Sequence, residues 1–114
     1  MKAPIPAGRR PRRVLFSGYA PVHFLCFLPV YQALRRDSEV ELWLSGGFRQ
    51  PGDDGVRYEI RGFYDTFDVD RERVIPIEEA QTQDFDVLVC AHLSDTLFPR
   101  HAGRTVQIFH GVSF

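Results

Sequence analysis

This sequence of 114 residues has few of the features that mark several functional classes. Its two cysteines, Cys26 and Cys90, have no CxxC spacing, so we expect neither a zinc site nor a thiol redox site. Both cysteines lie in apolar runs and are predicted to be buried, unpaired side chains in a reducing compartment. No apolar run reaches about 18 residues, the length that a membrane-spanning helix needs.

Charge of neither sign dominates the chain. There are 14 basic and 15 acidic residues, giving a net charge of −1, and a single lysine among the basic residues. This balance gives no support for a nucleic-acid partner. The arginines between Arg9 and Arg13 precede an apolar stretch that Ser17, Gly18 and Pro21 interrupt, which is unlike a secretory signal. The sequence therefore predicts a cytoplasmic location. We expect the protein to be either free in the cytoplasm or held peripherally at the inner face of the membrane.

Several sequence motifs of catalysis and cofactor binding are also missing. The chain contains no GxGxxG dinucleotide fingerprint, no phosphate-binding P-loop and no GxSxG hydrolase elbow. Asp65, Asp68 and Asp70 lack the glycine and the terminal glutamate of a calcium-binding loop, so we interpret them as a solvated acidic loop. No cofactor and no metal ion is expected.

Short apolar segments separated by turn residues are the main feature that is present. Residues 1–12 are predicted to be a disordered leader, and residues 13–114 a single domain. The pattern predicts five strands, with an exposed loop at 48–57; the strands are expected at 13–18, 40–45, 74–77, 85–91 and 105–109. Pro76 cannot donate a backbone hydrogen bond, which places the third of these strands at a sheet edge.

One long helix is expected at residues 22–36. Its predicted apolar positions are Leu25, Leu28, Val30, Tyr31 and Leu34, and Pro29 is expected to kink it or to mark where its regular part begins. Strands that alternate with helical segments favour right-handed crossovers. The predicted fold class is therefore α/β, a Rossmann-like, mostly parallel sheet of about five strands.

Polar residues gather where the predicted strands end. Parallel sheets of this kind bind ligands beyond the carboxyl ends of their strands. The candidate binding residues at this edge are Ser17, Gly18, His23, Gly46, His92 and Gly111, and His110 is the candidate general base. An imidazole titrates near neutral pH, and the glycine that follows His110 leaves room for a substrate.

Five of these residues also have a structural interpretation. Ser17 and Gly18 are compatible with a tight turn, and Gly46 with a strand exit at positive φ. His23 has the surroundings of a core histidine, and His92 those of a loop cap. The sequence leaves both interpretations open.

Two segments resemble a known family. VLFSGYAPVHF at residues 14–24 and VQIFHGV at residues 106–112 are similar to the corresponding parts of the CDP-glycerol glycerophosphotransferases. That resemblance implies the N-terminal domain of a two-domain glycosyltransferase-B fold. In the implied reaction, an acceptor hydroxyl attacks the β-phosphate of a CDP-linked polyol and releases CMP, and His110 matches the histidine proposed as general base. The implied partners are a CDP-polyol donor and a hydroxyl acceptor, bound together with a second domain.

The resemblance leads to two expectations for the isolated chain. Because the family's donor-binding domain is missing, we expect an incomplete, inactive N-terminal fragment. Because no helix follows the last predicted strand, we expect exposed apolar surface there, and self-association or pairing with a second chain. Two alternatives remain: a non-catalytic Rossmann-like binding or pairing module, and a fragment of a UDP-sugar 2-epimerase or glycosyltransferase.

Overall fold

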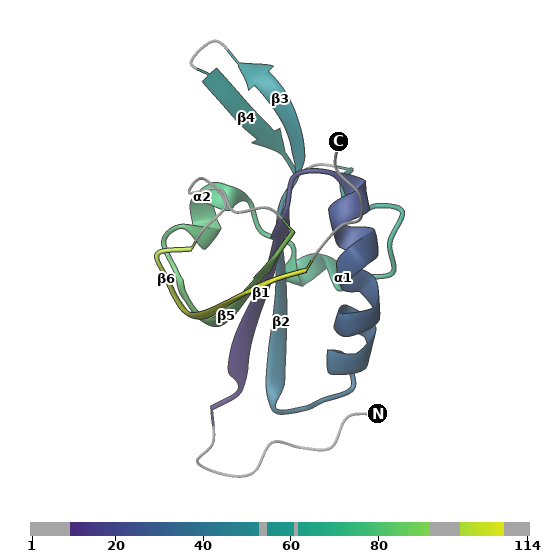
Figure 1. Ribbon diagram of the computed structural model, residues 1–114, viewed down its shortest axis with the longest axis vertical. Coiled ribbons are helices and arrows are strands. Elements are labelled where there is room, and N and C mark those ends of the chain that lie inside the picture. The colour runs from purple at the N-terminus through teal and green to yellow at the C-terminus, as the bar shows by residue number, and fades with distance from the viewer. Residues whose placement is uncertain (1–9, 53–54, 61, 92–98, 109–114) are drawn as a thin grey trace.

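A four-stranded parallel sheet forms the centre of the computed structural model, which describes residues 10–52, 55–60, 62–91 and 99–108 (Figure 1). The strand order is β2-β1-β5-β6, and all three neighbouring pairs are parallel. Their bounds are Arg12–Gly18 for β1, Val40–Gly46 for β2, Asp84–Cys90 for β5 and His101–Gln107 for β6. The chain thus goes to β2 on one side of β1 and then crosses to β5 on the other. This arrangement confirms the α/β class and the parallel sheet.

Strand β1 is the most deeply buried part of the sheet. Its residues from Val14 to Gly18 form an unbroken run with little or no exposed surface. A strand with strands on both sides and helices on both faces needs apolar or small side chains at every position, not at alternate ones. The central position of β1 therefore explains the apolar run that predicts a buried strand at 13–18.

Helix α1, Pro21–Leu34, covers one face of the sheet. Pro21 occupies the first helical turn, where its missing N–H costs nothing, and the helix continues through Pro29. The predicted apolar face was wrong at two positions, because Leu25 and Val30 are exposed. The inner face carries larger rings instead, and its buried residues are His23, Phe24, Phe27 and Tyr31. Aromatic rings bury more area than Leu or Val, and this set has the helical spacing that lets all four face the sheet.

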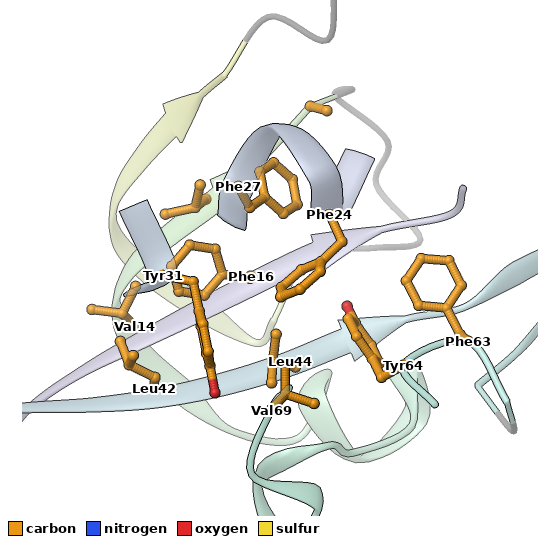
Figure 2. Close-up of a cluster of buried hydrophobic side chains, with 12 residues drawn as sticks. Val14, Phe16, Phe24, Phe27, Tyr31, Leu42, Leu44, Phe63, Tyr64 and Val69 are labelled. Atoms are coloured by element: carbon orange, nitrogen blue, oxygen red, sulfur yellow. The ribbon is translucent and has the colours of Figure 1, made fainter. Parts of the chain in front are cut away.

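Aromatic rings fill the space beneath α1 (Figure 2). Phe24 is the centre of this cluster, with ring centroids 5.6 Å from Tyr31, 5.2 Å from Tyr64 and 4.6 Å from Phe67. All three pairs are close to edge-to-face, the geometry that aromatic quadrupoles favour. Through these contacts the segment 62–69 packs against the helix and the sheet, although that segment has little regular structure of its own.

The opposite face of the sheet is covered by a much smaller element. Helix α2, Ile77–Ala80, lies over this face, and the buried side chains there are Leu15, Ile75, Ala80, Phe85 and Leu88. A short 3-10 helix, Arg71–Arg73, precedes it. The polar segment 78–84 contains the end of α2 and the turn after it.

A charged cluster lies on the same face of the sheet as α2. Glu41 accepts hydrogen bonds from Trp43 Nε1 at 2.6 Å and Arg13 Nε at 3.3 Å, and it lies 3.3 Å from Arg73 Nη1. Both guanidinium groups stack over the Trp43 ring. Partial burial pushes the pKa of the Glu41 carboxyl upward, but Trp43 and the two arginines outweigh burial and hold that pKa below its usual value.

This cluster predicts an acid-dependent part of the stability. A carboxyl whose pKa is lower in the folded chain contributes stability above its unfolded pKa, and that contribution is lost as pH falls through the folded pKa. We expect Glu41→Gln to lower the free energy of unfolding by about 1 kcal/mol at pH 7 and to change it much less at pH 3. Urea unfolding at both pH values measures this. Glu72→Gln, at an exposed position, is the control, and an equal loss from Glu41→Gln at both pH values would contradict the expectation.

The loop predicted at 48–57 is wrong. Residues Phe48–Gly52 and Gly55–Glu59 form strands β3 and β4, an antiparallel hairpin that projects from the carboxyl end of β2 (Figure 1). The sequence PGDDG is typical of a loop, but Gly-rich turns also join hairpin strands. Pro51 is tolerated because each strand of a two-stranded sheet has a free edge.

The prediction of about five strands in one sheet holds only in part. The segment 74–77 contributes a single parallel bridge, Leu44 to Val74, before Pro76 and α2 end its extended course. The last strand, predicted at 105–109, begins earlier, since β6 already includes His101 and Gly103. β6 lies at one edge of the sheet and is largely exposed. Most of its exposed side chains are not large and apolar; Val106 is the main exception.

Candidate functional site

The carboxyl ends of β1 and β5 meet where the chain changes direction in the sheet. Ser17 of β1 is in register with Cys90 of β5. From β1 the chain leads through α1 to β2 on one side, whereas from β5 it leads to β6 on the other. Connections that leave neighbouring strands in opposite directions open a crevice above the sheet, which is the usual ligand position in this fold class. The hairpin β3–β4 stands at the same edge (Figure 1).

A row of small polar side chains lies just below this edge. Ser17 is in register with Ser45 of β2 on one side and with Cys90 on the other, and all three residues are fully buried. Within the described residues, Ser45 Oγ has no hydrogen-bond partner. Burial raises the pKa of the Cys90 thiol, so this sulfur stays protonated and is a poor nucleophile. These three side chains therefore include two hydroxyl groups but no reactive thiolate.

Glycines shape the ends of β1 and β2. Gly46 and Gly47 have φ angles of 105° and 126°, and Gly47 N–H donates to the Gly18 carbonyl at 2.9 Å. A Cβ at Gly46 would lie 1.8 Å from that same oxygen, and one at Gly18 would lie 2.7 Å from His23 Cβ. Close packing is thus sufficient to explain glycine at both positions, and it brings the two strand ends into direct contact.

His23 holds the connection between β1 and α1. Its imidazole is buried, accepts a hydrogen bond at Nδ1 from the Tyr19 N–H at 3.1 Å, and lies edge-on to the Tyr19 ring. The backbone N–H of His23 donates to the Ala20 carbonyl at 2.9 Å. Because Nδ1 is an acceptor here, the neutral ring carries its proton on Nε2. His23 therefore holds the backbone at Tyr19 and Ala20, between β1 and α1, in place at the carboxyl edge of the sheet.

Tyr64 belongs to this edge, although no sequence pattern predicts it there. Its hydroxyl donates to the Ser45 carbonyl at 2.7 Å, inside the aromatic cluster. Burial raises the pKa of this hydroxyl far above its usual value, so Tyr64 stays neutral. The aromatic residues between 58 and 67 show no regular period, and a long-range contact with the end of β2 leaves no mark on such a segment.

The structure brings together four of the seven predicted site residues. Ser17, Gly18, His23 and Gly46 lie at the adjoining ends of β1 and β2. His92, His110 and Gly111 lie outside the described residues.

Two surface hollows are lined by other residues. A cavity of about 350 Å³ is lined by Arg10, Pro11, Arg12, Glu39 and Asp86, at the amino ends of the strands. Another, of about 340 Å³, is lined by residues that include Tyr64, Asp65, Arg71 and Val74, and an ion pair between Arg71 and Asp65 lies at its wall. Neither is lined by a predicted site residue.

Searches against family models, curated proteins and solved structures give no match for this chain. The class that the fold defines is an α/β protein with a Rossmann-like parallel sheet. Any more specific function has to be argued from the residues at the carboxyl edge.

Proposed function

We propose that this chain is the acceptor-side domain of a glycosyltransferase-B-type enzyme related to the CDP-glycerol glycerophosphotransferases. The enzyme would transfer a polyol phosphate from a CDP-linked donor to an acceptor hydroxyl. The observation that carries the proposal is the reversal of the sheet between β1 and β5, with Ser17, Gly18, His23 and Gly46 gathered at its carboxyl edge. The two segments that resemble the family are 14–24, which spans this edge, and 106–112, which begins within β6.

The start of α1 favours a phosphorylated ligand at this edge. Pro21 opens the helix, Ala20 provides no side-chain cap, and no acidic residue lies in the first turn. The partial positive charge of the helix end is therefore not offset by a side chain of that turn. A phosphate above the ends of β1 and β2 would be attracted to it.

His110 is the proposed general base and follows the end of β6 by three residues in the sequence. In the proposed step His110 takes the proton of the acceptor hydroxyl as its oxygen attacks the β-phosphorus. The bond from that phosphorus to the bridging oxygen breaks, and CMP leaves with the electron pair. Phosphoryl transfer depends mainly on positioning and charge stabilisation, so a base poised near neutral pH is a useful component.

Release of CMP from CDP-glycerol in the presence of a polyol acceptor tests this proposal. We expect no turnover by the chain alone, because the proposed donor contacts belong to another domain. Fusion to the donor-binding domain of a CDP-glycerol glycerophosphotransferase should give CMP release. His110→Asn should lower that rate by about 10²- to 10⁴-fold.

Two results would contradict the proposal. CMP release by the chain alone would show that the acceptor-side role is wrong. An active fusion that His110→Asn leaves unchanged would remove the proposed base. The matched control is His101→Asn, an exposed histidine at the start of β6, which should keep full activity.

A further inference from the structure

Helix α1 is apolar on its outer side as well as on its inner side. No charged residue occurs anywhere in Pro21–Leu34. Val22, Leu25 and Val30 are 45%, 55% and 38% exposed, although each is a large apolar side chain. We call the outward row the outer stripe, and it consists of Val22, Leu25, Cys26, Pro29, Val30 and Ala33.

A helix that is apolar all round is normally covered on all sides. The inner side of α1 is covered by the sheet and the aromatic cluster, whereas the outer stripe is open in the single chain. Among the described residues, no helix has the length and apolar character needed to cross a bilayer. The outer stripe is thus an open apolar surface along one side of α1.

The pattern of the outer stripe is symmetric. Its positions follow the spacing 0, 3, 4, 7, 8 and 11, which reads the same from either end. Two copies of α1 packed antiparallel about a two-fold axis would oppose residues whose numbers sum to 55. The pairs are Val22 with Ala33, Leu25 with Val30, and Cys26 with Pro29.

We propose that the outer stripe of α1 is the interface of a homodimer. In this arrangement the large Val22 side chain meets the small Ala33, and the two branched side chains Leu25 and Val30 meet each other. A two-fold interface needs this kind of self-complementary surface. Antiparallel packing also places the partial negative end of each helix beside the partial positive end of the other.

Charges near α1 favour a second copy over a lipid surface. Helices that lie on anionic membranes carry Lys and Arg along their polar face. Beside α1, Arg35 is paired with Asp68 at 3.3 Å and with Asp70 at 3.1 Å, and both carboxylates face solvent. With Arg36 and Asp37 at the same end of the helix, the charges of these five side chains sum to −1. They give an anionic bilayer no net attraction, whereas an apolar stripe on a second copy brings no charge against the first.

The expected dimer is weak. A helix of 14 residues is about 21 Å long, and one side of it is much smaller than the roughly 800 Å² per partner of a standard interface. Dimerisation should therefore depend on concentration, with monomers at low micromolar protein and dimers at hundreds of micromolar.

Sedimentation velocity over this concentration range tests the proposal. The wild-type chain should double in mass as its concentration rises, and Leu25→Glu should raise the dissociation constant at least about tenfold. Val106→Glu is the matched control, because Val106 on β6 is 44% exposed, close to the value for Val22. Circular dichroism establishes that each variant is folded.

An oxidative cross-link gives an independent test of the pairing. Pro29→Cys places a thiol opposite Cys26 of the second copy and should give a disulfide-linked dimer, whereas Gln32→Cys, beside the stripe, should not.

Several outcomes would overturn the proposal. These are a wild-type monomer at hundreds of micromolar, an undiminished dimer in Leu25→Glu, and a dimer lost only in Val106→Glu. A monomeric chain that binds phosphatidylglycerol vesicles through Leu25 would show that the stripe contacts lipid instead.

Discussion

Gly46→Ala is expected to prevent the chain from folding or to destabilise it by more than about 3 kcal/mol. Two effects act at this position. The backbone has a φ of 105°, which side chains other than glycine rarely adopt, and an added Cβ would lie 1.8 Å from the Gly18 carbonyl oxygen. That oxygen belongs to the buried central strand, so it cannot move without disturbing β1. Chemical denaturation followed by circular dichroism gives the loss directly.

Gly62→Ala separates the two effects. Gly62 also has a positive φ, of 79°, but an added Cβ there would meet only Asp65 Oδ2 at 3.6 Å, an ordinary contact. Its expected loss is about 1 to 2 kcal/mol, from backbone strain alone. Equal losses in the two variants would mean that the ends of β1 and β2 are not packed as closely as the structure has them.

Phe24→Ala is expected to lower the free energy of unfolding by about 3 to 5 kcal/mol. The ring is fully buried and packs edge-on against Tyr64 (Figure 2). It also packs against Phe67, so it joins α1 to the irregular segment 62–69. Removing it leaves a cavity and also frees the segment that carries Tyr64, whose hydroxyl bonds the Ser45 carbonyl. Urea unfolding measures the total, and hydrogen exchange should show the largest loss of protection in segment 62–69.

The neighbouring Leu25→Ala is the matched control for that substitution. It removes a side chain of similar volume from the same helix, but from the exposed side, so we expect a change within about 0.5 kcal/mol in dilute, monomeric protein. Equal losses from Phe24→Ala and Leu25→Ala would contradict the assignment of Phe24 to the buried side of α1 and Leu25 to its exposed side.

The sheet could be predicted because its strands carry a strong local signal. β1 and β5 are apolar runs bounded by turn residues, and β2 alternates before ending in glycines. The inner face of α1 could not be predicted in the same way. In a helix without charged residues, apolar periodicity does not distinguish the buried side, which includes Phe24, from the open side, which includes Leu25. The hairpin β3–β4 was missed because its turn residues dominate a short, polar segment.

The candidate site was predictable only where a strand ends. Ser17, Gly18 and Gly46 could be placed because parallel strands bring their carboxyl ends to one edge. The contacts made there were not predictable. Gly46 meets the Gly18 carbonyl, and Tyr64 reaches Ser45, from positions 28 and 19 residues apart in the sequence. Such pairings depend on tertiary packing, which no local pattern encodes.

The location of the ligand site tests the proposed function most directly. Amide shifts of the ¹⁵N-labelled chain, titrated with glycerol 3-phosphate and with short poly(glycerol phosphate), would map it. We expect saturable shifts at the carboxyl edge, at Gly18, Tyr19, Val22 and Gly46. Shifts confined to the amino edge, around the cavity lined by Arg12 and Glu39, or no saturable shifts at all, would contradict the proposed function.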